Sequence, residues 1–239
     1  MNISPNERLI VSLDFDNIED ALNLTDLLKE EVFFYKVGLQ MFLKYDGRIL
    51  LELKERKARI FLDLKLNDIP NTIVSAIRVL LDYSLDIVNM HALSGFKAMR
   101  EAKKAILESS HQVKLVGVTV LTSLDDFEFE KLGFSFPASL EAEKLSLLAK
   151  EAGLDGVVLS AKEALRIKEL CGEDFITICP GIRRVEDNKD DQQRTSTPFY
   201  AIKNKADYIV VGRPIIKATS PKKEALNIIK EIEKGLEER

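Results

Sequence analysis

The sequence predicts a (β/α)8 barrel of the TIM type, formed as one domain by residues 1–239. Eight short runs rich in β-branched and apolar residues recur along the chain, and most segments between them carry apolar residues at helical spacing. Dividing the length by eight leaves about 30 residues per unit, the size of one strand with its crossover helix. No proline-, glycine- or serine-rich linker divides the chain, so a single domain is expected.

The first four predicted strands are RLIVSLDF, VFFYKVGLQ, ARIFLDLKL and LDIVNMHAL, at residues 8–15, 32–40, 58–66 and 85–93. Each run is rich in β-branched and other apolar residues, and the first three also contain aromatic residues, all of which suit a buried parallel strand. Each also carries a polar or charged residue in its second half: Asp14, Lys36, Lys65 and His91. Four strands of one sheet therefore end in side chains that are costly to bury.

The last four predicted strands are KLVGVTVLT, DGVVLSA, FITICPGI and ADYIVVGRP, at residues 114–122, 155–161, 175–182 and 206–214. The seventh is followed by residues 181–198, a stretch without clear periodicity. This is long for a connection between elements, which indicates a functional or mobile loop.

Strand periodicity assigns the two faces of the third run. Side chains alternate between faces, so two rows result: Leu62, Leu64 and Leu66 against the helices, and Phe61, Asp63 and Lys65 toward the barrel interior. The active sites of such barrels lie at the carboxyl-terminal mouth. The polar strand ends are therefore expected to converge there.

Four charged residues of alternating sign are predicted at this mouth, namely Lys36, Asp63, Lys65 and Asp68. Opposite charges held together offset part of each other's desolvation cost. One interpretation is a buried salt-bridge network that only sets the packing of the barrel. The other is a preorganised field, with an ammonium aimed where negative charge develops and a carboxylate held beside it.

A phosphate site is predicted after the eighth strand, where Gly212 precedes Arg213. Barrels of this kind often bind phosphate with the loops after strands seven and eight, because glycine permits close backbone approach and a guanidinium grips two oxygens. Gln192 and Arg194, in the loop after strand seven, are placed to close over the same anion. The alternative is that Arg213 is an ordinary surface arginine.

Composition excludes several classes of protein. With 46% hydrophobic residues, 31% charged residues and a net charge of −4, the chain lacks the basic excess of a general nucleic-acid binder. The start lacks the pattern of a signal peptide and no run reaches about 18 apolar residues, so a cytoplasmic protein without membrane contact is expected. Two cysteines, Cys171 and Cys179, and two histidines form no zinc cluster, so both cysteines are assigned to the core and no metal is expected.

The stretch LDLKLNDIPNT resembles the D-x-K-x-x-D-I-P-N-T motif of the orotidine 5′-phosphate decarboxylase family, in its bacterial type. FYKVGLQ, VTVLTS, CPGIR, DQQR and VGRPI resemble further motifs of that family in the same order, so the resemblance covers almost the whole chain. It implies a TIM-barrel homodimer that converts orotidine 5′-phosphate to UMP and CO2 without a cofactor, in de novo pyrimidine biosynthesis.

The resemblance also implies roles for single residues. Lys65 would stabilise negative charge at the pyrimidine C6 and deliver the proton that replaces CO2, while Asp63 would sit against the departing carboxylate. Asp68, with Ile69 and Thr72, would reach the site of the neighbouring subunit. The implied substrate contacts are Asp14 and Lys36 at the ribose, Thr122 and Ser123 at the base, Gln192 between base and phosphate, Gly212 and Arg213 at the phosphate, and Arg183 elsewhere on the substrate.

The chain departs from the family pattern in two places. HALSG, at residues 91–95, has Ser94 where the family shows the first glycine of H-x-x-G-G, which leaves His91 either structural or in contact with substrate. The loop RRVEDNKDDQQR lacks the glycine that often precedes its D-Q pair. Neither departure touches the charged residues.

Two other functions remain open. Related phosphate-binding barrels, the sugar-phosphate decarboxylases and hexulose-phosphate synthases, hold Mg²⁺ with an acid near the end of strand two, where this chain has Lys36. A protonated lysine offers no lone pair to a metal, which disfavours this alternative. A catalytically silent barrel that binds a nucleotide or sugar phosphate is the third possibility, because one fold hosts many functions.

Overall fold

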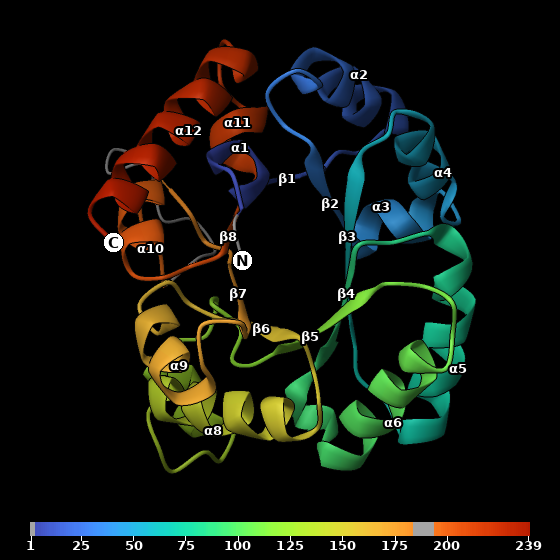
Figure 1. The fold of residues 1–239 in the computed structure, drawn as a ribbon, viewed down its shortest axis with the longest axis vertical. Coiled ribbons are helices and arrows are strands. Elements are labelled where there is room, and N and C mark those ends of the chain that lie inside the picture. The colour runs from blue at the N-terminus through green and yellow to red at the C-terminus, as the bar shows by residue number, and fades with distance from the viewer. Residues whose placement is uncertain (1–2, 184–193) are drawn as a thin grey trace.

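The computed structural model describes residues 3–183 and 194–239 and confirms the predicted (β/α)8 barrel. Eight parallel strands close into a barrel in their chain order, and the helices surround them (Figure 1). The strands are β1 (Leu9–Ser12), β2 (Phe34–Gly38), β3 (Arg59–Leu66), β4 (Ile87–His91), β5 (Lys114–Val118), β6 (Gly156–Val158), β7 (Ile176–Cys179) and β8 (Tyr208–Val211).

At least one helix or 3-10 turn follows each strand along the chain, and β2, β5 and β8 are each followed by two helices. The helices in the first half are α1 (Pro5–Arg8), α2 (Ile18–Leu28), α3 (Leu39–Lys44), α4 (Arg48–Glu55), α5 (Pro70–Leu80) and α6 (Phe96–Leu107), with 3-10 turns η1 (Leu81–Tyr83) and η2 (Ala92–Ser94). Those in the second half are α7 (Asp126–Lys131), α8 (Ala138–Glu151), α9 (Ala164–Cys171), α10 (Pro198–Lys203), α11 (Arg213–Ile216) and α12 (Pro221–Glu237).

The strands are shorter than the predicted runs, mainly because the last residues of every run except the third belong to the connection that follows. Asp14, for example, lies two residues beyond the end of β1. The last residues of the predicted runs thus supply the mouth of the barrel, which is where a TIM barrel forms its sites.

Two apolar cores confirm the predicted faces of the strands. The barrel interior is filled by residues that include Ile10, Phe34, Phe61 and Val210. The larger core lies between strands and helices and includes Leu62, while Leu64 and Leu66 pack against it. The alternation of side chains along β3 therefore separates the interior row from the helix-facing row as expected.

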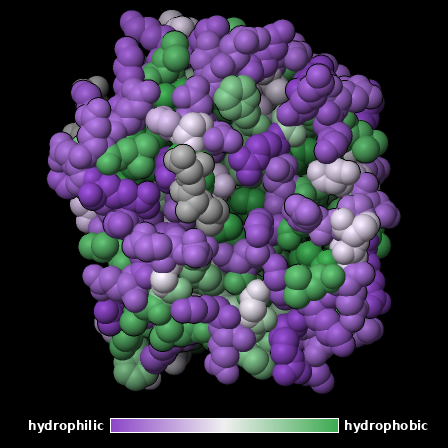
Figure 2. Space-filling model, viewed as in Figure 1, coloured by the Kyte–Doolittle hydropathy of each residue, from purple (hydrophilic) through white to green (hydrophobic). Residues whose placement is uncertain are grey.

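The face drawn in Figure 2 is mostly hydrophilic, with apolar residues interspersed in small groups. This matches the high content of charged residues, 31% of the chain. Within the described residues, the helices are too short or too polar to cross a membrane.

An aspartate directly before each of β4, β6 and β8 ties neighbouring strands together at their amino-terminal ends. Asp86, Asp155 and Asp207 accept the backbone N–H of Ile60, Leu115 and Thr177 on the preceding strand, at 2.9 Å in each case. Each carboxylate also pairs with a basic side chain, which are Arg59, Lys103 and Lys168 respectively. The sequence pattern of an apolar residue and aspartate before the strand, as in SLDI, GLDG and KADY, therefore marks an inter-strand contact.

The three aspartates differ in burial. The pair of Asp207 with Lys168, at 2.6 Å, is 8% and 2% exposed, whereas the pair of Asp86 with Arg59 is 32% and 34% exposed. The Lys168 ammonium completes its shell with the carbonyls of Glu173 and Phe175. A buried charge that loses its partner is far more costly than an exposed one.

We expect Asp207→Ala to lower the free energy of unfolding by about 3–5 kcal/mol, because it leaves the buried Lys168 ammonium without its carboxylate partner. Asp86→Ala removes the same kind of backbone contact but a solvated ion pair, so its loss should be about 1–2 kcal/mol. Urea unfolding at neutral pH measures both. Equal losses for the two variants would show that burial of the ion pair does not set its contribution.

Candidate functional site

A cavity opens at the carboxyl-terminal mouth of the barrel, and most of the predicted site residues line it. Its volume is about 400 Å³, within the range usual for small-molecule sites. The lining residues are Ser12, Asp14, Lys36, Phe61, Asp63, Lys65, Val118, Val120, Leu121, Thr122, Ser123, Val158, Leu159, Pro180, Gly181, Arg183, Val210, Gly212 and Arg213. Polar groups converge on one pocket from β1, β2, β3, β5, β7 and β8 or the connections after them.

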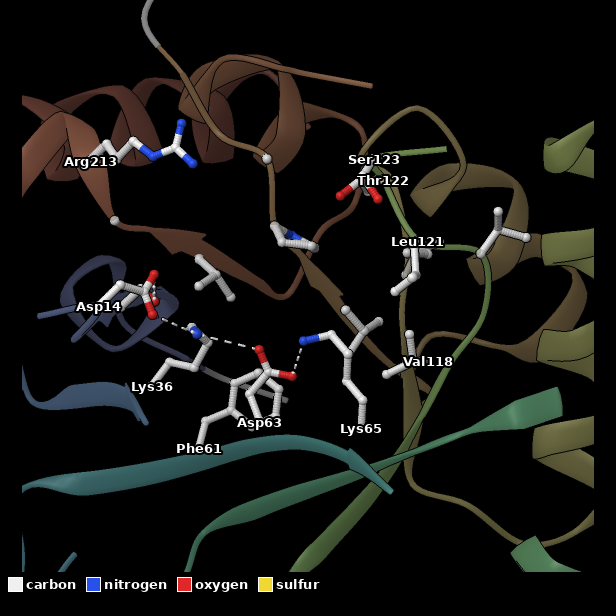
Figure 3. Close-up of a pocket in the computed structure, with 18 of the residues that line it drawn as sticks. Asp14, Lys36, Phe61, Asp63, Lys65, Val118, Leu121, Thr122, Ser123 and Arg213 are labelled. Carbon is white, nitrogen blue, oxygen red and sulfur yellow. Dashed lines mark hydrogen bonds and ion pairs between the residues drawn. The ribbon is translucent and has the colours of Figure 1, made fainter. Parts of the chain in front are cut away.

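Four of these side chains form a row of alternating charge across the cavity floor (Figure 3). Lys36 Nζ lies 3.2 Å from Asp14 Oδ1 and 3.4 Å from Asp63 Oδ2. Lys65 Nζ donates to the other oxygen of Asp63, Oδ1, at 2.7 Å. Within this chain the row consists of Asp14, Lys36, Asp63 and Lys65, and Asp68, which is expected to act in the neighbouring subunit, lies outside it.

The electrostatics of the row keep its central members ionised. Burial raises the pKa of the Asp63 carboxyl, but Lys36 and Lys65 outweigh this, and the pKa lies below its usual value. Burial likewise disfavours the Lys36 ammonium, yet Asp63 and Asp14 raise its pKa above the ordinary value. At the Lys65 end the row is more open to solvent than at its centre, since the Lys65 side chain is 38% exposed and that of Asp63 is 11% exposed. The Lys65 side chain therefore faces the cavity.

The backbone at two positions is arranged around this row. Lys65 has a φ of 53°, in the left-handed region that side chains other than glycine rarely adopt, which costs about 1–3 kcal/mol. Gly38 lies against the row, where an added Cβ would stand 3.0 Å from Lys36 Nζ and 3.3 Å from Asp14 Oδ1. The strained backbone sets the position of Lys65, and the missing side chain at Gly38 leaves room for the Lys36 ammonium beside Asp14.

The residues predicted to bind phosphate and base line the sides of the cavity away from this row. The Arg213 side chain extends from the start of α11 toward the cavity, and Thr122 and Ser123 lie across from it after β5 (Figure 3). Gly212 leaves room beside the first strand, where an added Cβ would stand 3.3 Å from the Cβ of Ser12. Arg183 also lines the cavity, and its Nη1 donates to the Ile182 carbonyl at 2.9 Å.

The remaining predicted residues lie away from this cavity. Asp68 is exposed and accepts the backbone N–H of Ile69 at 2.7 Å. Ile69 is 66% exposed, and Thr72 is exposed on α5. None of the three is among the lining residues, and Gln192 falls outside the described part of the chain.

Neither Arg194 nor His91 lines the cavity. Arg194 pairs with the buried Glu163 and donates its backbone N–H to the Thr122 carbonyl at 3.2 Å, so it braces the loop beside the cavity. His91 ends β4 outside the cavity lining, and burial together with Lys65 lowers its pKa. Ser94, the departure from the family pattern, donates to Asn67 Oδ1 at 2.8 Å.

Two residues in direct contact with the row were missed by the sequence analysis. Ser12 Oγ donates to Asp14 Oδ2 at 2.7 Å, and Asn89 Nδ2 donates to Asp63 Oδ1 at 2.6 Å. Both could have been found by strand periodicity, because Ser12 shares a face with Asp14 and Asn89 shares a face with His91. Among the described residues, no three His, Cys, Asp or Glu side chains gather in a way that could hold a metal ion.

The shifted pKa values predict how the row contributes to stability with pH. The lowered pKa of Asp63 gives a contribution that is present above about pH 4 and lost as the pH falls through that lowered pKa. The raised pKa of Lys36 gives one that is present below about pH 10 and lost as the pH rises through the raised value.

We therefore expect the difference in unfolding free energy between the unmodified protein and Asp63→Asn to vary with pH, because only the carboxyl titrates. It should change in favour of the unmodified protein as the pH rises from about 2 to 6. Urea unfolding across this range measures it. A difference that stays constant over the range would contradict the lowered pKa of Asp63.

Comparison with known proteins shows close relatives over nearly the whole chain. The chain is 44% identical over 231 residues to the orotidine 5′-phosphate decarboxylase of Carboxydothermus hydrogenoformans, covering 95% of this chain and 96% of that protein. It is 44% identical over 220 residues to the protein of the same name from Gloeothece citriformis, covering 90% of this chain and 93% of the relative.

A solved structure gives the same result. The crystal structure of orotidine 5′-phosphate decarboxylase from Lactobacillus acidophilus matches with a TM-score of 0.82 and 33% identity, over 95% of this chain and 99% of the other. The model of the orotidine 5′-phosphate decarboxylase / HUMPS family matches residues 7–228. This range holds both the charged row and Arg213, which confirms the resemblance found in the sequence. The chain belongs to the orotidine 5′-phosphate decarboxylase / HUMPS family.

Proposed function

We propose that this protein decarboxylates orotidine 5′-phosphate to UMP and CO2 in pyrimidine biosynthesis, without a cofactor. One observation carries the proposal: the Lys65 ammonium faces a cavity while hydrogen-bonded at 2.7 Å to the largely buried carboxylate of Asp63. The family supports the same reaction. A protein that only binds a ligand has no need of a strained backbone that aims a cation at a carboxylate.

The chemistry of the reaction accounts for the charges. Loss of CO2 from the pyrimidine C6 leaves an electron pair in the plane of the ring, where the π-system cannot delocalise it. Stabilisation must then come from fixed charges that are already in place, and such preorganised groups often supply the largest part of catalysis. Lys65 stands to stabilise this pair and then to protonate C6, which completes UMP. Asp63 orients the ammonium and faces the carboxylate that departs.

Other predicted residues suit the remaining parts of the substrate. Arg213 is assigned to the phosphate, with Gln192 bridging phosphate and base, Arg183 contributing to substrate binding and backbone groups near Gly212 donating to the phosphate. Thr122 and Ser123 are assigned to the base, and Asp14 with Lys36 to the ribose hydroxyls. Binding energy from the phosphate, far from the reacting carbon, can hold the substrate against Asp63.

A homodimer completes the site in this proposal. Asp68, Ile69 and Thr72 lie outside the cavity of their own chain and are exposed, which leaves them available to a second copy. Asp68 of one chain then stands beside Lys65 of the other and extends the alternation of charge. The burial of Ile69, which is 66% exposed in the single chain, adds apolar contact area.

Metal-dependent chemistry of the sugar-phosphate type is disfavoured by the charge of Lys36. Asp63 and Asp14 raise its pKa, so the ammonium is protonated and has no lone pair for a metal. Where the metal-dependent relatives have an acidic metal ligand, this chain therefore has a cation, Lys36, which neutralises the neighbouring carboxylates. A chelator added to the assay below tests this directly.

We expect the purified protein to consume orotidine 5′-phosphate in buffer with EDTA, followed by the change in pyrimidine absorbance. Lys65→Ala should lower turnover by at least about 10³-fold, because it removes both the charge and the proton donor. Lys65→Arg should also fail, since a guanidinium keeps its proton.

The matched control is Lys203→Ala, which removes an exposed lysine that pairs with Glu238 between α10 and α12. It should leave turnover unchanged. No turnover by the folded, unmodified protein would reject the proposed reaction, and loss of turnover with EDTA would favour the metal-dependent alternative.

A mixing experiment tests the shared site. Chains carrying Lys65→Ala and chains carrying Asp68→Ala are each expected to be impaired alone. Co-expressed, they form mixed dimers in which one of two sites holds both native residues, so about a quarter of unmodified turnover per chain should return. The matched control pairs Lys65→Ala with Asp63→Ala, which restores no intact site because both residues belong to the same chain. Recovery in the control, or none in the test pair, would contradict the assignment of Asp68.

A further inference from the structure

Asn89 is a completely buried polar side chain inside the barrel, at 0% exposure. It lies on β4 between Val88 and Met90, which both pack in the apolar core outside the strands. A buried amide costs free energy unless its donor and acceptor are both satisfied. The side chain of Asn89 forms its two hydrogen bonds with β3, one with the backbone N–H of Lys65 and one with the carboxylate of Asp63.

The first contact is to the backbone of Lys65. The Lys65 N–H donates to Asn89 Oδ1 at 2.8 Å, where a regular parallel ladder would use a main-chain carbonyl. The ladder is irregular at this point, since Leu62 pairs with Val88 and Leu66 with Met90. Three residues of β3 thus face the single residue Asn89 on β4. The side chain of Asn89 replaces the missing ladder partner and holds Lys65 at its φ of 53°.

The second contact is to the carboxylate of Asp63. Asn89 Nδ2 donates to Asp63 Oδ1 at 2.6 Å, and the same oxygen accepts from Lys65 Nζ at 2.7 Å. Only a side chain with an acceptor and a donor on one planar group matches both partners, because the N–H of Lys65 must meet an oxygen and the carboxylate must meet a hydrogen. Asn89 therefore fixes both the carboxylate and the backbone of the residue that carries the ammonium.

We propose that Asn89 is a positioning residue for the decarboxylation, one that sets the geometry of the Asp63–Lys65 pair without touching substrate. The inference rests on the proposed function. Asn89 is not among the residues that line the cavity, so its removal acts on the pair and not on the walls that hold phosphate and ribose. A misplacement of about 1 Å in a catalytic group can cost about 100-fold in rate.

The test separates turnover from binding. Asn89→Ala removes both contacts and should lower kcat about 100-fold, with KM for orotidine 5′-phosphate and the Kd for UMP within about threefold of the unmodified values. Asn89→Asp keeps an acceptor for the Lys65 N–H but replaces the donor to Asp63 with a negative charge. It should lower kcat at least as far, which identifies the contact to Asp63 as the one that matters.

A matched control removes buried hydrogen bonds at the other end of the barrel. Thr177 is 0% exposed on β7, where its hydroxyl donates to the Lys205 carbonyl at 3.0 Å. Thr177→Val should shift the urea midpoint downward, as Asn89→Ala does, but leave kcat unchanged. This comparison separates a loss of stability from a loss of catalytic geometry.

Three results would overturn the proposal. In the first, Asn89→Ala keeps kcat within about threefold and resembles Thr177→Val, which makes Asn89 a purely structural residue. In the second, kcat and UMP affinity fall by the same factor, which indicates collapse of the whole cavity. In the third, the unmodified protein shows no turnover, in which case the proposed function fails and this inference fails with it.

Discussion

The Asp63 carboxylate is the point on which the site depends. One of its oxygens accepts from Lys65 and Asn89, and the other faces Lys36, which also pairs with Asp14. Residues of β2, β3 and β4, and Asp14 two residues after β1, are joined through this one group. A carboxylate in the apolar interior would normally take up a proton, but its neighbours keep its pKa below the usual value. The charge of Asp63 and the positions of its partners are therefore set together.

The two ends of the barrel use the same interaction for different purposes. At the amino-terminal end, Asp86, Asp155 and Asp207 each accept a backbone N–H and pair with a basic side chain, and the Asp207–Lys168 pair is almost fully buried. At the mouth, Lys65 keeps 38% of its side chain exposed toward the cavity. Charges that are fully paired stabilise the barrel. A charge that is held in place but still open can act on a ligand.

The backbone strain at the mouth is consistent with a functional role for the charges there. Lys65 holds a left-handed backbone conformation, the ladder between β3 and β4 is broken beside it, and Gly38 leaves no side chain next to the Lys36 ammonium. Each feature costs some stability, and the regular strands and filled interior below supply the rigid frame that tolerates them. Such local exceptions to good folding rules are expected where a fold carries a function.

The sequence by itself determined the eight strands, the two faces of β3 and most of the polar residues of the cavity, including Asp63, Lys65 and Arg213. These follow from periodicity and from short motifs, which are local properties of the chain. Only the tertiary structure decided that Asp14 pairs with Lys36, that Glu163 takes the Arg194 guanidinium and that Asn89 bonds to β3. Each of these contacts joins residues from different strands or loops, and the register between neighbouring strands, which places them within reach, is not encoded in any one segment.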